Sequence, residues 1–164
     1  MIENSMLYRG IPKNKSDYEF LSKAYPEDCT NGFVFGQPLI DKVKNRYYIC
    51  VSLLATMNCT VANGTVTVIE VVPETINRSS TIMDSTGKFI FDGDIIKMLP
   101  DCSYNDSICE VYNYKGVSCV DYWTPEYDRT ALAFLHDDLF TFEIIGNIYD
   151  NPDLIKGSDK YESI

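Results

Sequence analysis

Residues 86–98 read Thr-Gly-Lys-Phe-Ile-Phe-Asp-Gly-Asp-Ile-Ile-Lys-Met, and this stretch decides the fold class. Two short apolar runs, residues 89–91 and 95–96, flank Asp92-Gly93-Asp94. An Asp-Gly pair between apolar runs indicates a tight turn, because glycine takes positive φ without steric cost. Ser85-Thr86-Gly87 indicates an earlier turn. The stretch therefore predicts a turn, a strand, a second turn and another strand, and it identifies no chemistry.

The composition agrees with a β-rich globular protein. The chain has 164 residues, 45% of them hydrophobic, with 12 Tyr and 8 Phe, and aromatic side chains pack well on a pleated sheet. No apolar run approaches the roughly 20 residues that span a bilayer. The first residues lack the basic and apolar segments of a signal peptide. We therefore expect a cytoplasmic protein without membrane contact.

The order of turns and apolar runs predicts two regions and a tail. Residues 1–78 form an N-terminal β-rich region, residues 79–157 form a barrel of short strands, and residues 158–164 form a frayed tail. Residues 73–85 are polar and rich in turn residues, so they are interpreted as the passage between the regions. The expected strands cover residues 6–9, 32–40, 46–54, 59–61 and 65–72, then 88–91, 95–99, 108–114, 117–123 and 140–149.

Short helices complete the prediction. Ser16 is the expected N-cap of a helix over residues 17–24, with Glu19 at the capping-box position. A second short helix begins near Pro152, because proline suits the first helical position. Residues 130–135 fit either a helical turn or a strand. Fewer than about a quarter of the residues are expected to be helical.

Four segments resemble the YopX family of phage and prophage proteins. Residues 87–96 resemble its "NGK-E-I-(Y/F)-E-G-D-I-V" signature, and residues 142–154 resemble its terminal "(F/C)EVIGNIYENPEL". Residues 72–76 and 32–36 resemble "V-x-P-E-T-(V/I)" and "GxWVYG". The chain departs from the family's "Q(Y/F)TGLKDKNGK" at residues 77–88. The resemblance implies a mainly β fold with an SH3-like barrel in the C-terminal half, expression in an infected or lysogenic bacterium, no established activity and no catalytic residue.

The residues of these motifs are interpreted as scaffold. Glycine, asparagine and aspartate are the residues that turns and bends require. A turn-building role is therefore favoured over a functional one. The motif residues are Gly87, Asp92, Gly93 and Asp94 in the turns, and Glu143, Gly146 and Asn147 in a bend of the last strand.

The net charge and the cysteine content limit the classes of partner, metal and cofactor that we expect. The net charge is −10, and lysine and arginine are read as scattered singly, so direct nucleic-acid binding is not expected. An ordinary soluble surface is the favoured interpretation of the excess acidic charge, and the alternative is a surface that favours basic partners. None of the six cysteines forms a CxxC pair and His136 is the only histidine, so no metal and no cofactor is expected. The cysteines are expected to be free thiols.

Candidates for catalysis are abundant but unspecific. The carboxylates Asp92, Asp94, Glu110, Asp121, Asp137, Asp138 and Glu143 could supply a pair for acid–base chemistry. Asp137 and Asp138 beside His136 could form a metal or base site, although a solvated loop is the favoured interpretation. No nucleophile elbow, phosphate-binding loop or dinucleotide motif is present.

Aromatic residues offer a better lead to a binding surface. Tyr112 and Tyr114 alternate with Val111 and Asn113, so they share one face of a strand. That face is either core or an exposed groove, and core is favoured because aromatic residues dominate small cores. The candidate partner-binding residues are Tyr112, Tyr114, Tyr122, Trp123, Asp137 and Asp138.

Two classes of function follow. The first is a non-catalytic module that binds a host or phage protein. Its sharpest form is an anti-defence inhibitor, for example an anti-CRISPR protein, whose acidic surface blocks a nucleic-acid groove. The second is a small hydrolase or nucleic-acid-processing accessory. Open strand edges and aromatic surface also favour a homo-oligomer, and the resemblance implies higher-order assembly.

Overall fold

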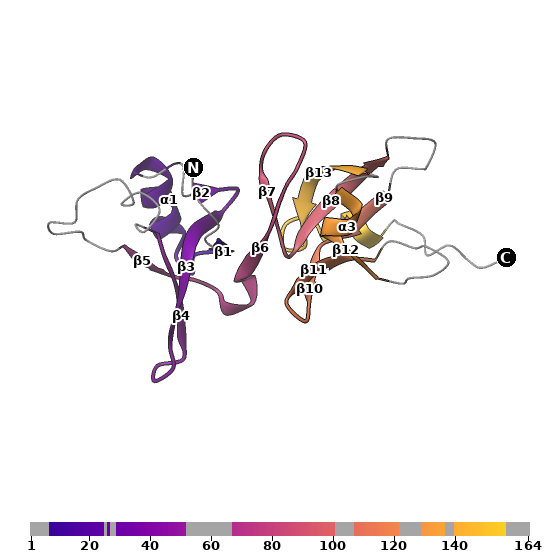
Figure 1. The fold of residues 1–164 in the computed structure, drawn as a ribbon. Helices are drawn as coiled ribbons and strands as arrows, with labels where there is room; N and C mark the ends of the chain where they lie inside the picture. The colour runs from indigo at the N-terminus through magenta and orange to yellow at the C-terminus, as the bar shows by residue number, and fades with distance from the viewer. Residues whose placement is uncertain are drawn as a thin grey trace, which may run out of the picture. The chain divides into compact units, whose positions relative to one another are not determined.

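The computed structural model describes residues 7–24, 26, 29–51, 67–100, 107–121, 129–136 and 140–156. Figure 1 shows that most of its elements are strands, which confirms the predicted mainly β class. The chain divides into two compact units, residues 1–78 and residues 79–164. The predicted strand at residues 59–61 and the predicted tail lie outside the described residues.

The N-terminal unit is an antiparallel sheet. Its strands are β1 (Tyr8–Gly10), β2 (Cys29–Thr30), β3 (Phe33–Asp41), β4 (Arg46–Cys50) and β5 (Val68–Glu70), followed by the 3-10 helix η3 (Pro73–Thr75). The sheet order is β5-β4-β3-β1, and β2 pairs with β3. Gly36 is required in β3, because a Cβ there would lie 2.1 Å from the carbonyl oxygen of Cys50 on β4.

Helix α1 (Lys15–Ala24) supplies part of the core of this unit. It begins two residues before the predicted start, because Asn14 rather than Ser16 flanks its first turn. The Asn14 amide donates to the Asp17 carboxylate at 3.2 Å, and the Asp17 N–H donates to the Asn14 carbonyl at 3.1 Å. Leu21 is fully buried. The buried cluster contains Leu21, Cys29, Val34, Ile49, Val51, Ile69 and Val71.

Strand β6 (Asn77–Met83) corrects the interpretation of residues 73–85 as a polar passage. Asn77 and Arg78 pair with β1, and Ser79 and Met83 pair with β7 (Phe89–Phe91). The polar sequence of β6 does not indicate a strand, because β6 is stabilised by pairing with a strand on each side and not by an apolar pattern. Thr81 has φ of +69°, which accounts for the irregular register between Ser79 and Met83.

The C-terminal unit contains the remaining elements. They are β7, β8 (Asp94–Pro100), β9 (Ser107–Glu110), β10 (Tyr112–Tyr114), β11 (Val117–Val120), β12 (Thr130–Ala131), α3 (Leu132–His136), β13 (Phe140–Asn147) and α4 (Asp153–Lys156). The strands form two antiparallel three-stranded sheets, β13-β8-β9 and β10-β11-β12, while β7 pairs with β6. Among the described residues these sheets do not close into a barrel, so the SH3-like barrel is not confirmed.

Two predicted elements of this unit are divided in the structure. The strand expected over residues 108–114 breaks at Val111, whose carbonyl accepts from the Gly93 N–H and whose N–H donates to the Asp94 carbonyl. Residues 130–135 form a two-residue strand, β12, that continues directly into α3. The sequence is compatible with either a helical turn or a strand at these residues, and the structure contains a strand followed by a helix.

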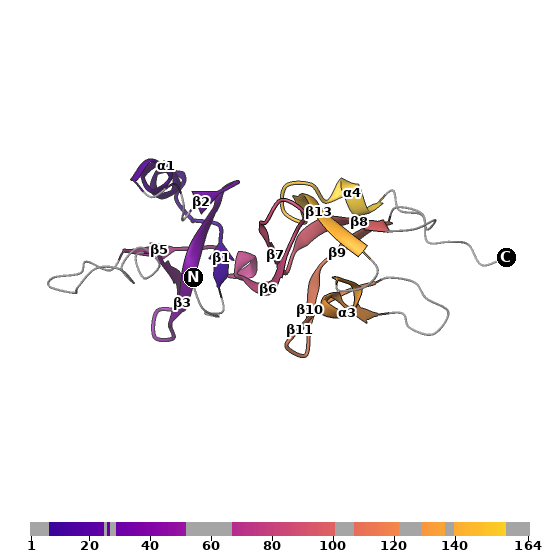
Figure 2. The same ribbon diagram turned by 45° about the horizontal axis from the view of Figure 1, so that its top comes forward.

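One buried cluster forms the core of the C-terminal unit. Its side chains come from β7, β8, β9, β11, β13 and α3, as well as from Val111 between two strands. Figure 1 shows α3 beside β11 and β12, which it contacts, and Figure 2 shows it beside β11 again. The cluster contains Ile90, Ile96, Met98, Cys109, Val111, Val120, Leu132, Leu135, Phe140 and Phe142.

Candidate functional site

The signature turn lies at the start of β8 and is held by its backbone. Gly93 has φ of +84°, which few other residues adopt at low cost. Its N–H donates to the Val111 carbonyl at 2.6 Å, and its carbonyl accepts from the Ile148 N–H at 3.0 Å. Asp94 is almost fully buried, and its Oδ2 accepts from the Phe91 N–H at 2.8 Å. The turn thus ties together three separate parts of the C-terminal unit.

Asp92 joins this turn to the second sheet. The Ser118 hydroxyl donates to Asp92 Oδ1 at 2.7 Å, and the Asn113 amide donates to Asp92 Oδ2 at 3.4 Å. The Asp92 side chain is buried. A buried carboxylate is tolerated only when it accepts such hydrogen bonds. Both of its oxygens are therefore engaged by β10 and β11 rather than presented to a ligand.

The turn before β7 is built around Asp84. Asp84 Oδ1 accepts from the Thr86 N–H at 2.9 Å, the Thr86 hydroxyl at 2.7 Å and the Lys88 N–H at 2.9 Å. Gly87 takes φ of +83° in the same turn. Burial alone would raise the pKa of Asp84, but the hydrogen bonds from Lys88 and Thr86 outweigh it and lower the pKa.

The terminal motif forms a bulge and a loop in β13. The register shifts between Ile144 and Gly146, and a Cβ on Gly146 would lie 2.6 Å from Asn151 Oδ1. Asn147 Oδ1 accepts from the N–H groups of Tyr149 and Asp150 at 2.9 and 3.0 Å. Glu143 does not belong to the bend, contrary to its predicted role. It is exposed in the regular part of β13, opposite Lys97.

The aromatic residues of β10, half-buried Tyr112 and exposed Tyr114, form a small polar network with Asp121 and Arg129, which we call the tyrosine face. The Tyr112 hydroxyl donates to Asp121 and accepts from Arg129 Nε, the latter at 2.7 Å. The Arg129 guanidinium lies 3.8 Å from the centre of the Tyr114 ring. Tyr114 is 40% exposed and neither ring belongs to the buried cluster, so the favoured core interpretation is wrong for both.

Ionisable groups near the tyrosine face have shifted pKa values. Burial raises the pKa of Tyr112, and the Asp121 carboxylate raises it further against the opposing effect of Arg129. Burial also raises the pKa of Cys119, which lies opposite Tyr112 on β11, and it raises the pKa of Cys109 to about 11. Such thiols are poor nucleophiles at neutral pH. The described cysteines, Cys29, Cys50, Cys109 and Cys119, are thiols and not disulfides.

The remaining predicted site residues cannot be placed. Tyr122, Trp123, Asp137 and Asp138 lie outside the described residues.

In the part of the chain that is described, no group of three His, Cys, Asp or Glu side chains could hold a metal ion. Likewise, none of the described helices is both long and apolar enough to cross a membrane.

Charge is distributed unevenly along the chain, which the sequence reading missed. Residues 1–78 hold eight acidic and eight basic residues, whereas residues 79–164 hold sixteen acidic and six basic ones. The net charge of −10 thus belongs entirely to the C-terminal unit. Lysine and arginine are also not all scattered singly, because Lys42, Lys44 and Arg46 lie within five residues. Counting charges by region would have revealed both features.

The fold and these contacts define a mainly β protein of two units, in which motif carboxylates hold turns. The family described as "YopX protein" matches residues 39–156, so the chain belongs to the YopX family. It is 35% identical over 91 residues to the SPbeta prophage-derived uncharacterized protein YopX of Bacillus subtilis (strain 168). That alignment covers 52% of this chain and 66% of the relative, slightly under two thirds of its length.

A solved structure has the same overall fold. The crystal structure of protein yopX from Bacillus subtilis superimposes with a TM-score of 0.53 at 18% identity. The match covers 92% of this chain and 98% of that one. At this identity the likeness concerns the fold alone, and it assigns no activity to any residue.

Proposed function

We propose that this prophage-type YopX protein is a non-catalytic binding module that engages a basic protein surface through its C-terminal unit. The observation that carries the proposal is the uneven distribution of charge. Residues 79–164 have a net charge of −10, whereas the acidic and basic residues of residues 1–78 balance to a net charge of zero. Concentrated charge of one sign accelerates encounter with a partner of the opposite sign and orients it.

The tyrosine face is the proposed contact within that unit. Tyrosine and arginine are the residues most often found at the centre of protein interfaces, because they combine large apolar area with polar groups. Tyr112, Tyr114 and Arg129 are arranged by hydrogen bonding and ring stacking before any partner arrives. Such preorganisation reduces the entropy lost on binding. Asp121 adds an acceptor for a basic partner at the same place.

Affinity capture with matched variants tests this proposal. The immobilised chain would be incubated with host lysate, and the captured proteins quantified by mass spectrometry. We expect a Tyr112→Ser/Tyr114→Ser variant to capture a specific basic protein at least about tenfold less, the loss of one or two interface hot spots. Phe20→Ser is the control, because Phe20 is 65% exposed on α1 in the other unit. Equal capture by all three forms would contradict the proposal.

A second candidate function is supported by the same charge distribution. An anti-defence inhibitor could present its acidic unit to the basic groove in which a host immune nuclease binds nucleic acid. The test is the plating efficiency of a targeted phage on a defended host that expresses the chain. Rescue by the wild-type chain, reduced by Asp-to-Asn and Glu-to-Gln changes at exposed C-terminal positions, would support it. No rescue at equal expression would exclude the tested defence system.

Two structural proposals accompany this function, together with a cytoplasmic location. First, the C-terminal unit has an SH3-like arrangement, supported by the single buried cluster that its two sheets share. Backbone NOEs that link its strands into a closed ring would support this, and two open sheets would contradict it.

Second, the chain forms a homo-oligomer, because exposed strand edges favour self-association. Light scattering at the monomer mass of 18.7 kDa would contradict the second.

A further inference from the structure

The β3–β4 hairpin of the N-terminal unit has an exposed apolar end. Leu39 and Ile40 are each 52% exposed and Val43, in the turn, is 95% exposed. Figures 1 and 2 show this hairpin as a ribbon that extends beyond the rest of its own unit. We define the hairpin end as residues 39–46. Single exposed apolar side chains are ordinary, but three at one projecting end require an explanation.

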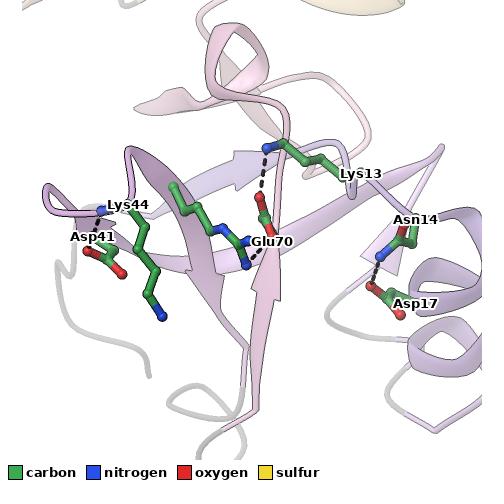
Figure 3. Close-up of polar contacts among 7 residues, drawn as sticks. Lys13, Asn14, Asp17, Asp41, Lys44 and Glu70 are labelled. Atoms are coloured by element: carbon green, nitrogen blue, oxygen red, sulfur yellow. Dashed lines mark hydrogen bonds and ion pairs between the residues drawn. The ribbon is translucent and has the colours of Figure 1, made fainter.

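The turn of the hairpin end is held rigidly by a side chain. Asp41 Oδ1 accepts from the N–H groups of Val43 and Lys44 at 3.0 and 3.1 Å, and Asn45 takes φ of +51°. Figure 3 shows Asp41 bonded to the backbone of Lys44 while the Lys44 amine points away from it. The Asp41 carboxylate is thus used to shape the turn, and Val43 remains at its tip.

The other acidic group near the hairpin is engaged as well. Glu70 on β5 forms ion pairs with Lys13 at 2.7 Å and with Arg46 at 3.6 Å (Figure 3). The hydrogen bond from Lys13 is the main cause of its lowered pKa, against the opposing effect of burial. Among the described residues, Lys42 and Lys44 have no such ion pair, and both are exposed. The hairpin end therefore presents two lysines beside its apolar side chains.

The apolar side chains lie on both faces of the hairpin. Leu39 pairs with Tyr48 and Ile40 pairs with Tyr47, and neighbouring residues of a strand point to opposite faces. A flat protein surface would cover only one of these faces. An occupant that surrounds the end covers Leu39, Ile40 and Val43 together. A bilayer interface does this, and anionic headgroups at the same depth would meet Lys42 and Lys44.

We propose that the hairpin end inserts into the interfacial region of an anionic lipid bilayer. This contact goes beyond the proposed protein-binding function and uses the other unit. It is a peripheral contact that needs no spanning helix, and it departs from the expectation of no membrane contact, which rested on the lack of a spanning run and of a signal peptide. Each lysine near an anionic surface strengthens binding by roughly fivefold. The acidic C-terminal unit opposes approach to an anionic surface, and salt at physiological concentration reduces this repulsion. The attachment is therefore weak and reversible.

Vesicle flotation with the full chain tests the proposal. The probes are vesicles of phosphatidylcholine mixed with phosphatidylglycerol, and vesicles of phosphatidylcholine alone. We expect binding to the anionic vesicles only, weakened by salt. Lys42→Gln/Lys44→Gln should weaken it by roughly 25-fold. Val43→Asp should also weaken it, and its 95% exposure means that the fold is kept. Absence of wild-type binding to anionic vesicles at low salt would overturn the proposal.

A matched control separates the hairpin from general charge. Lys15→Gln/Lys23→Gln removes the same charge from exposed positions on α1. We expect it to bind anionic vesicles like the wild type, and an equal loss would overturn the proposal. Light scattering without vesicles tests whether a second copy of the chain, rather than a bilayer, covers the hairpin end. A wild-type mass above 18.7 kDa that falls to it in Val43→Asp would place the hairpin end on a second copy and would also overturn the proposal.

Discussion

The two units of this chain use their charged residues differently. In the N-terminal unit, acidic and basic residues are equal in number, and Glu70 pairs with Lys13 and Arg46. In the C-terminal unit, buried carboxylates accept hydrogen bonds from backbone or hydroxyl groups, as at Asp84 and Asp92. That unit carries the whole excess of negative charge. Carboxylates shape turns in both units, as Asp41 does in the N-terminal one, but among the described residues the ion pairs lie in the N-terminal unit.

This difference shows that the net charge of a whole chain does not reveal how charge is distributed between its units. A value of −10 for the whole protein suggests a uniformly acidic surface. In fact one unit is neutral and has a local excess of lysine at the end of a hairpin. Electrostatic arguments about partners therefore have to be made for each unit separately.

The largest expected effect is a break in the N-terminal unit alone. Gly36→Ala places a Cβ 2.1 Å from the backbone oxygen of Cys50, so β3 and β4 must separate. We expect a loss of about 4 kcal/mol or more of unfolding free energy, as for other exceptional substitutions. Hydrogen exchange of the backbone amides of β8 and β13 in the other unit should be nearly unchanged. Circular dichroism should show the loss.

Gly32→Ala is the control for that experiment. Gly32 has φ of +83°, but a Cβ there would meet nothing within 4 Å. The expected cost is only about 1–2 kcal/mol, from backbone strain. Equal effects of the two alanines would mean that conformation and not the contact with Cys50 decides the outcome.

The second effect breaks the C-terminal unit. Gly93→Val forces a β-branched residue to φ of +84°, which should cost about 2–3 kcal/mol. Here the backbone amides of β8 and β13 should exchange faster, while those of β3 and β4 should not. Asp92→Asn and Asp94→Asn keep the shape of the turn and should fold and keep partner binding. Stable Asn variants that have lost binding would instead identify the signature as a working site.

A smaller effect appears as pH is lowered. The folded state lowers the pKa of Asp84 below its ordinary value of 3.8, so Asp84 stabilises the fold above that pH. This stabilisation is lost as pH falls through the folded-state pKa. The pKa of Glu110 is raised by burial and by Asp121, so its protonation has the opposite sign and favours the folded state.

Asp84→Asn separates the two contributions. Urea denaturation at pH 7 should show a loss of about 1 kcal/mol, the usual value of such hydrogen bonding. The loss should shrink toward zero below pH 3.8. A constant difference between the wild type and the variant at every pH would contradict the role of the charged carboxylate.

The smallest effect concerns thiol reactivity. Burial raises the pKa of Cys109 to about 11, whereas Cys50 in the N-terminal unit is only half-buried. In the native protein, a maleimide should therefore label Cys50 well before Cys109, as peptide mass spectrometry can measure. After denaturation all six cysteines should react. Native disulfides, or fastest labelling of Cys109, would contradict this prediction.

The sequence by itself determined the features that depend on a few adjacent residues. Gly93 takes the positive φ that the Asp-Gly pair indicated, and Gly87 takes φ of +83° in the turn expected at residues 85–87. The bulge near Gly146 and the mainly β class were predicted correctly as well. These are local properties, because turn residues restrict φ and ψ wherever they occur. The family signature at residues 87–96 and the terminal motif at residues 142–154 each contain such a turn or bulge.

Only the tertiary structure decided which surfaces and charges are available. Strand β6 exists because β1 and β7 pair with it, and nothing in its polar sequence indicates those partners. Alternation placed Tyr112 and Tyr114 on one face, but only packing decided that Tyr114 is exposed and Tyr112 half-buried rather than in the core. Glu70 pairs with Lys13, 57 residues away. Such contacts depend on how strands distant in sequence are brought together, and periodicity along one strand carries no information about its neighbours.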